Sequence, residues 1–135
     1  MSYIILIETP TPIEYCELRK AGGLSEKTID ADTISLPKSL FSVVIRSSND
    51  NELIGMGRVV GDLGCHVQIC DIVVNPNYQK RGFSKLLMQE IMKFVEKEVH
   101  QCAFVNLFAD VGFLYERYGF IKSNQSIGMY LYRKN

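Results

Sequence analysis

Apolar residues alternate with polar ones, or form short apolar runs, in six segments of the chain, which predicts a sheet-rich fold. These segments are rich in β-branched or aromatic residues and cover residues 2–8, 39–47, 52–61, 65–74, 103–110 and 127–134. Short turns separate the second, third and fourth segments, so we expect these three to form an antiparallel meander.

Two helices are expected between the first two strands. Thr11 can cap the first helix, Pro12 suits its first turn, and Gly22–Gly23 ends it. Residues 25–36 begin with Ser25, a second capping residue, and predict a short helix or an irregular segment.

The longest helix is expected from Gly82 to about Val99, where apolar residues repeat every four positions. The apolar stripe consists of Phe83, Leu87, Ile91 and Val95, and the polar sector of Lys85, Gln89, Lys93 and Glu96. Residues 112–120 predict a further short helix and turn. Because the long helix lies between two strands, we expect a right-handed parallel crossover.

These elements together predict one α+β (mixed α/β) domain spanning residues 1–135. Helices would cover both faces of a central mixed sheet of about six to seven strands, antiparallel first and then parallel after the crossover. A chain of 135 residues suits one domain with a sizeable core.

Composition narrows the classes of function. The 15 acidic residues equal the 15 basic ones, which argues against a general binder of nucleic acid or of membrane surfaces. The N-terminus lacks a signal-peptide pattern and no apolar run is long enough to cross a membrane, so we expect a cytoplasmic protein. The four cysteines form no C-x-x-C pair. We expect reduced thiols that act as small core residues, and no metal site.

The junction Asn75–Leu87, NPNYQKRGFSKLL, joins a predicted strand to the longest predicted helix. The first N–H groups of a helix lack intrahelical partners and the helix dipole adds positive charge, so a helix start can bind phosphate. Gly82 would let a ligand approach the backbone, and Lys80, Arg81 and Lys85 add positive charge. The alternative is an ordinary loop with exposed basic residues.

This junction lacks the glycine spacing of nucleotide P-loops and of the dinucleotide fingerprint. Instead, Gln79–Ser84, QKRGFS, resembles the Q/R-x-x-G-x-G/A motif of the GNAT superfamily of acyl-CoA N-acyltransferases. The preceding DIVVNPNYQ is similar to the fourth strand and loop of that family, and Leu114–Phe120, LYERYGF, is similar to its lYeklGF segment. The order of elements from Tyr3 to Arg133 also fits the family fold.

The resemblance implies that acetyl-CoA is bound as a co-substrate, without a metal. Backbone amides from Lys80 to Lys85 would hold its pyrophosphate, and the edge of the preceding strand would pair with its pantetheine amides. The residues implied at the coenzyme are Ile72, Val73, Val74, Gln79, Lys80, Arg81, Gly82, Phe83, Ser84 and Lys85. Two positions depart from the family pattern: Ser84 replaces Gly or Ala, and Ala109 stands where Asn is frequent.

The resemblance also implies direct attack by a neutral amine, with a tyrosine that protonates the departing thiolate. The matching residue is Tyr115. A phenol has an ordinary pKa of about 10, so it stays protonated at neutral pH and can donate. The alternative role of Tyr115 is that of a core aromatic on a short amphipathic helix. Tyr118 is a second, weaker candidate.

No general base stands out, but Asp71 interrupts an apolar run. By strand alternation it would share a face with Val67, Ile69 and Val73. A carboxylate on such a face could serve as the base, and the alternative is a structural ion pair with Arg58. The other candidates are His66, Asp110 and a chain of water.

These features predict an N-acetyltransferase that moves the acetyl group of acetyl-CoA to a primary amine. We expect a small-molecule amine, because the chain is short and shows no acidic groove for a basic protein tail; a protein or peptide amine is the alternative. Two other functions stay open: a non-catalytic acyl-CoA-binding or sensing module, and a phosphate-binding domain unrelated to coenzyme A. Sheets of this type often pair through edge strands or the C-terminal segment, so a homodimer is an expectation.

Overall fold

The computed structural model describes residues 1–110 and 112–133. Within them, five strands form one sheet in the order β1-β2-β3-β4-β5. Their bounds are Tyr3–Ile7 (β1), Phe41–Ser47 (β2), Leu53–Gly61 (β3), His66–Val74 (β4) and Phe104–Asn106 (β5). Neighbouring strands from β1 to β4 are antiparallel, and β5 lies parallel to β4. The predicted mixed sheet, with its meander and parallel crossover, is confirmed.

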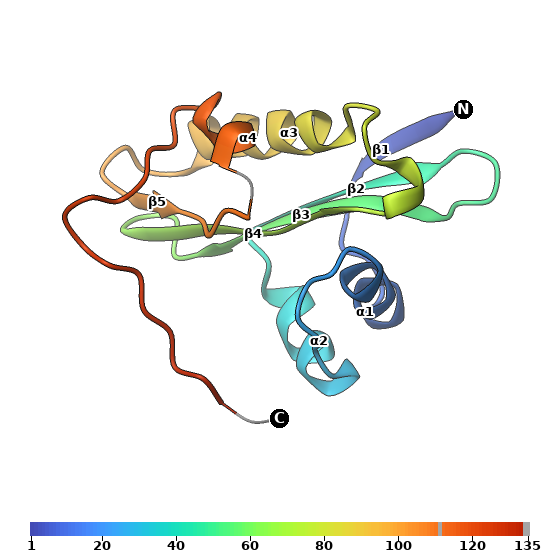
Figure 1. The fold of residues 1–135 in the computed structure, drawn as a ribbon, viewed down its shortest axis with the longest axis horizontal. Coiled ribbons are helices and arrows are strands. Elements are labelled where there is room, and N and C mark those ends of the chain that lie inside the picture. The colour runs from blue at the N-terminus through green and yellow to red at the C-terminus, as the bar shows by residue number, and fades with distance from the viewer. Residues whose placement is uncertain (111, 134–135) are drawn as a thin grey trace.

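Helices cover both faces of the sheet, as predicted (Figure 1). One face carries α1 (Pro12–Ala21) and α2 (Ile29–Ser35), and the other carries α3 (Phe83–Glu98) and α4 (Gly112–Glu116). Two short 3-10 turns, η1 (Leu36–Lys38) and η2 (Pro76–Tyr78), precede β2 and α3. No helix within the described ranges is long and apolar enough to cross a membrane.

The N-terminus of α1 is capped as the sequence predicts. Thr11 Oγ1 accepts from the Glu14 N–H at 3.2 Å and Glu14 Oε1 accepts from the Thr11 N–H at 3.0 Å, which makes a capping box. Helix α2 begins after Thr28, so the prediction that Ser25 caps it is wrong. The carbonyl and hydroxyl oxygens of Ser25 instead accept hydrogen bonds from Arg19, which holds this residue outside the helix.

Helix α3 packs its apolar stripe against the sheet. Phe83, Leu87 and Ile91 are buried and Val95 is half-buried, while the four residues of the predicted polar sector are exposed. Gly57 of β3 makes room for this packing, because a Cβ there would lie 2.8 Å from Ile91 Cδ1. The predicted helix and the face it buries are confirmed.

The sheet ends earlier than the sequence predicts. The strand expected at residues 103–110 is shortened to β5, and residues 127–133 of the expected last strand form no regular element. Residue 134 of that segment lies outside the described residues. The described ranges therefore hold five strands rather than about six to seven. In Figure 1 the chain beyond α4 runs past β5 and away from the sheet, and a strand does not form without a neighbour to pair with.

The four cysteines are free thiols, but they do not share one environment. Cys16 and Cys70 are half-buried, whereas Cys65 and Cys102 are exposed, so the predicted core role is wrong for the second pair. Both exposed residues lie in turns, one before β4 and one before β5. Burial raises the pKa of the Cys70 thiol to about 12, so this residue stays a thiol at neutral pH.

Candidate functional site

Strands β4 and β5 pair over three residues only, between His66–Gln68 and Phe104–Asn106. Asn106 Nδ2 donates to the main-chain carbonyl of Val67 at 3.3 Å, next to the last of these pairs. Beyond it, no strand within the described residues pairs with this side of β4. An extended ligand can pair with such a free edge like an added strand. The free stretch contains the three residues predicted at the pantetheine: Ile72, Val73 and Val74.

A bulge bends β4 in this free stretch. Asp71 and Ile72 together lie opposite Gly57 of β3, and Asp71 has a left-handed φ of +59°. Sequence alternation placed Asp71 on the face of Val67, Ile69 and Val73; this prediction is confirmed for Val73, which packs with Tyr15 of α1, and is wrong for Val67 and Ile69. The bulge shifts the alternation by one residue, so Asp71 faces α1, while Val67 and Ile69 pack in the core under α3.

Asp71 lies at the centre of a buried polar cluster. Its Oδ2 accepts from the Tyr15 hydroxyl at 2.6 Å and lies 3.3 Å from Arg58 Nη1, and its Oδ1 pairs with Arg19 Nη1. Tyr15, Arg19 and Arg58 are each less than a tenth exposed. Burial, and then the hydrogen bond to Asp71, raise the pKa of Tyr15, so its phenol is neutral. The ion pair with Arg58 that the sequence offered as the structural alternative is present; the parts played by Arg19 and Tyr15 were missed.

Helix α3 begins without a side-chain cap. Gly82, the residue before it, has a φ of +83°, and no atom lies within 4 Å of the position that a Cβ would take. The first helical hydrogen bond runs from the Leu86 N–H to the Gly82 carbonyl at 3.3 Å. The N–H groups of Phe83, Ser84 and Lys85 therefore precede the hydrogen-bonded ladder of the helix. An open helix start of this kind suits a phosphate group.

The loop before α3 is fixed to the end of β4 and carries positive charge. Gln79 Nε2 donates to the Val74 carbonyl at 3.1 Å, so this side chain ties the loop to the strand. The Arg81 guanidinium lies 5.5 Å from the centroid of the Tyr78 ring. Lys80 has a left-handed φ of +66°, and both Lys80 and Arg81 are exposed.

The first turn of α3 is anchored on two sides. The Phe83 side chain is 4% exposed and packs edge-on against Tyr3, with ring centroids 5.0 Å apart. The Tyr118 hydroxyl donates to the Lys85 carbonyl at 3.4 Å. This second contact brings the turn after α4 next to the start of α3. Ser84, between the two anchors, is half-buried.

Tyr115 lies on α4 and is half-buried against the core that α3 and the sheet form. Burial, and then the negative charge of Asp110, raise the pKa of its phenol. The phenol is therefore neutral at physiological pH and can donate a proton. Asp110 itself is exposed, as is Ala109 beside it.

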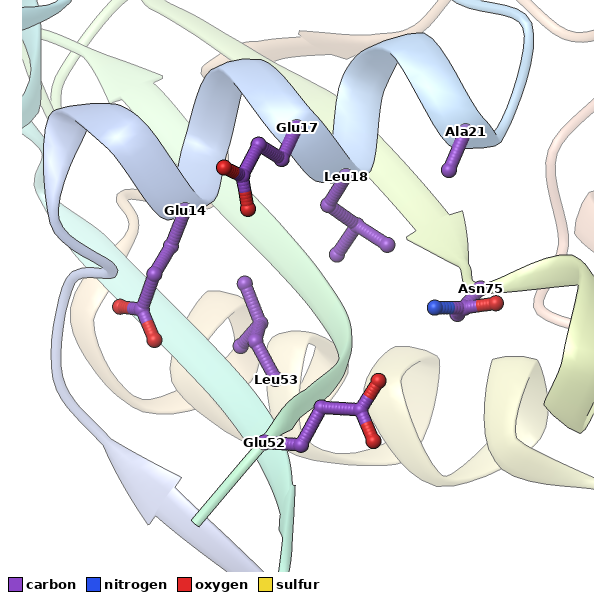
Figure 2. Close-up of a pocket in the computed structure, with 7 residues that line it drawn as sticks. All are labelled: Glu14, Glu17, Leu18, Ala21, Glu52, Leu53 and Asn75. Atoms are coloured by element: carbon purple, nitrogen blue, oxygen red, sulfur yellow. The ribbon is translucent and has the colours of Figure 1, made fainter. Parts of the chain in front are cut away.

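A separate cavity of about 280 Å³ lies between α1 and β3 (Figure 2). It is lined by Glu14, Glu17, Leu18, Ala21, Glu52, Leu53 and Asn75. Two of its carboxylates are engaged: Glu14 accepts from Arg46 at 2.6 Å, and Glu52 accepts from the Tyr78 hydroxyl at 3.2 Å. The hydrogen bond from Arg46 lowers the pKa of Glu14 to about 2. Glu14 thus joins α1 to β2, and Glu52 joins η2 to the residue before β3; no lining residue belongs to α3 or α4.

Comparison with known proteins identifies the family. The acetyltransferase (GNAT) domain matches residues 38–122, the span from the end of η1 to the segment after α4. The chain belongs to the GNAT acetyltransferase family. The resemblance stated from the sequence is thereby confirmed, and with it the GNAT-like fold, whereas the individual site residues stay predictions.

Similar proteins include an uncharacterised N-acetyltransferase, ycf52, from Gracilaria tenuistipitata var. liui. It is 35% identical over 112 residues, which are 81% of this chain and 59% of that protein. This GNAT chain spans between half and about two thirds of the length of the curated relatives it matches first.

Two solved structures bear on the fold. A protein from meticillin-resistant Staphylococcus aureus, described as a probable acetyltransferase, is 37% identical with a TM-score of 0.91, and the match covers 98% of this chain and 100% of that one. A GNAT family acetyltransferase from Brucella melitensis, solved in complex with acetyl-CoA, has a TM-score of 0.68 at 18% identity and covers 90% of this chain and 84% of that one. The second likeness concerns the fold alone.

Proposed function

We propose that this chain transfers the acetyl group of acetyl-CoA to a primary amine on a small molecule. The observation that carries the proposal is the free edge of β4 leading directly into the open, uncapped start of α3. A strand edge suits the amides of pantetheine, and a helix start suits the pyrophosphate that follows them. The strand edge precedes the helix start along the chain, as the pantetheine precedes the pyrophosphate along the extended coenzyme.

The residues present fit this coenzyme. The N–H groups from Lys80 to Lys85 would hold the pyrophosphate, and the space beside Gly82 admits it close to the backbone. Exposed Lys80, Arg81 and Lys85 supply positive charge around it. The edge at Ile72–Val74 would pair with the pantetheine.

The chemistry of the proposed reaction uses α4. A neutral amine attacks the thioester carbonyl carbon, the carbon–sulfur bond breaks, and the thiolate takes the proton of the Tyr115 hydroxyl. The acetylated nitrogen then loses its extra proton, which returns through water to the Tyr115 phenolate and leaves a neutral amide. The Asp110 carboxylate acts on Tyr115 from nearby and is exposed, so we assign it to attract the ammonium form of the acceptor and to receive its proton through water. Asp71 already accepts from Tyr15 and pairs with two guanidinium groups, so in this proposal it holds the bulge and is not the base.

The experiment that tests the proposal measures thiol release from acetyl-CoA with a panel of small amines, polyamines and basic peptides. Thermal shifts with acetyl-CoA alone and with ADP alone run beside it. We expect turnover with a small amine and a larger shift with acetyl-CoA than with ADP. Turnover with peptides only would mean that the acceptor amine belongs to a protein or peptide and not to a small molecule. A shift without any turnover would favour the binding module, and equal shifts with ADP would favour a general phosphate site.

A matched pair of glycine variants tests the pyrophosphate site. Gly82→Ala is expected to weaken acetyl-CoA binding about tenfold, because the added methyl group occupies the open space beside the helix start and disturbs charge-assisted hydrogen bonds. Gly23→Ala is the control, since Gly23 has nearly the same φ, +80°, and an equally open Cβ position at the end of α1. Both variants carry the same backbone strain. The dissociation constants for acetyl-CoA are measured by calorimetry. Equal values for the two variants would contradict the proposal that the coenzyme binds at this loop.

A further inference from the structure

Two of the four cysteines, Cys65 and Cys102, are exposed and lie in turns that precede neighbouring strands. Cys65 comes directly before β4, and Cys102 lies two residues before β5, with the whole of α3 between them in the sequence. In Figure 1 β5 lies beside the start of β4, at the opposite end of β4 from the junction with α3. The proposed acetyl transfer gives neither thiol a role.

The two turns run side by side. Three contacts join residues 63–65 to residues 100–104, each of them to a main-chain carbonyl of the first turn. They are the His100 N–H to Leu63 at 2.9 Å, the Cys102 thiol to Gly64 at 3.8 Å and the Phe104 N–H to Cys65 at 2.7 Å. The Cys102 thiol therefore lies against the peptide group that joins Gly64 to Cys65.

The register of the two strands gives the separation of the two cysteines. His66 lies opposite Phe104 in the parallel pair. Continuing this register by one position places Cys65 opposite Ala103, and Cys102 is the next residue along. Neighbouring strands are about 4.8 Å apart and successive residues about 3.3 Å apart, so the two Cα atoms are roughly 6 Å apart. This separation suits a disulfide, which needs Cα atoms within about 7 Å.

The two thiols have room to meet. At Gly64 no described atom lies within 4 Å of the position that a Cβ would take, so the space beside this residue is open. Exposed side chains change rotamer rapidly, and a thiol is only a weak hydrogen-bond donor. The other two cysteines differ, because the Cys16 thiol donates to the Asp32 carboxylate at 2.6 Å and Cys70 is half-buried in β4.

We infer that Cys65 and Cys102 form a thiol–disulfide site that a low-molecular-weight disulfide, such as oxidised glutathione, converts to a bridge. One cysteine thiolate attacks a sulfur of the oxidant, forms a mixed disulfide and releases one glutathione thiol. The other cysteine attacks the protein sulfur of that mixed disulfide, the bond between the two protein sulfurs forms, and the second glutathione leaves. The protein loses two electrons and two protons, and the oxidant takes them up as it becomes two thiols.

The bridge encloses the elements that carry the proposed coenzyme site. Residues 65–102 contain β4, the junction that follows it and α3. Strands β4 and β5 pair over three residues only, and the bridge fastens them at the end where they pair. Closing a loop of this length restricts the unfolded chain. The oxidised protein is therefore expected to melt about 10 °C higher than the reduced protein.

Mass spectrometry of the full chain after incubation with oxidised glutathione tests the pair. The wild type is expected to lose two hydrogen atoms, and digestion is expected to give one linked peptide pair that contains Cys65 and Cys102. Cys65→Ser and Cys102→Ser are each expected to carry one glutathione instead, because no second thiol resolves the mixed disulfide. The matched control is Cys16→Ser, whose hydroxyl can keep the hydrogen bond to Asp32, and it is expected to form the bridge.

The melting temperature supplies a second measurement on the same samples. The rise on oxidation is expected in the wild type and in Cys16→Ser, and not in Cys102→Ser. Four free thiols in excess oxidised glutathione, glutathione on both cysteines of the wild type, or a disulfide between two chains on a non-reducing gel would overturn the inference. All samples lack coenzyme and substrate, so a failure of the proposed acetyl transfer leaves these results unaffected.

Discussion

Replacing Tyr115 by phenylalanine is expected to lower kcat about 100-fold, while the Kd for acetyl-CoA changes by less than about twofold. The phenol is half-buried and its pKa is raised by burial and by Asp110. It is therefore protonated at neutral pH and, in the proposed reaction, gives its proton to the thiolate, whereas phenylalanine fills the same space without a proton to give. Because the proton is needed in the transition state and not for binding, kcat and kcat/KM are expected to fall together.

The control for this prediction is Tyr118→Phe. That variant loses the hydrogen bond to the Lys85 carbonyl, which costs about 1 kcal/mol of stability, and it is expected to keep most of its turnover. The measurement is thiol release at saturating acetyl-CoA from pH 6 to 10. Since the pKa of Tyr115 is raised above its ordinary value, wild-type turnover is not expected to decline below about pH 10 through this residue. Equal losses in the two variants would contradict the assignment of Tyr115.

Asp71→Asn is expected to lower the free energy of unfolding by about 3–5 kcal/mol. The carboxylate is the only acid that pairs with Arg19 and Arg58 among the ion pairs of the described residues, and both guanidinium groups are buried. The amide removes the charge and leaves two cations side by side in a region of low dielectric. The Nε of Arg58 already has no hydrogen-bond partner in the described structure, so without the carboxylate this side chain keeps only the hydrogen bond from Nη1 to the Tyr15 hydroxyl at 3.4 Å.

Urea unfolding with an unchanged m-value measures this loss. Glu96→Gln, on the exposed face of α3, removes one acid without breaking such a cluster and is expected to stay within about 0.5 kcal/mol of the wild type. Kinetics at a temperature where the variant is folded separate the two roles of Asp71. A structural role leaves kcat nearly unchanged, whereas a fall of about 10²–10⁴-fold with loss of the acid limb would make Asp71 the base.

The elements that the sequence predicted well are those whose signals are local. The cap at Thr11, the end of α1 and the stripe of α3 depend on residues a few positions apart, and the structure confirms each of them. The loop predicted to bind phosphate also depends on a local signal, because Gly82 has a left-handed φ at the residue before the helix; its ligand stays a prediction.

The features that the sequence did not predict depend on residues far apart in the chain. The bulge at Asp71 arises where β4 meets Gly57 of β3, and a pattern of period two within one strand cannot register it. The cluster around Asp71 joins α1 to the sheet across more than 50 positions. The available signal was the spacing of Tyr15 and Arg19, four residues apart on one helix face. The last strand was predicted but does not form in the described residues, because a strand pattern says nothing about where its partner lies.

The polar cluster at the β4 bulge also has an electrical consequence. It contains two guanidinium groups, one carboxylate and a neutral phenol, so one positive charge is in excess within a buried region. Dissolved ions screen the field of exposed Lys80 and Arg81 within about 10 Å at 0.1 M salt, but they screen a buried charge much less. The excess positive charge of this cluster lies next to the free edge of β4, and its field persists at high ionic strength. Raising the salt concentration removes the long-range attraction of the loop for an anionic ligand and leaves the field from the core in place.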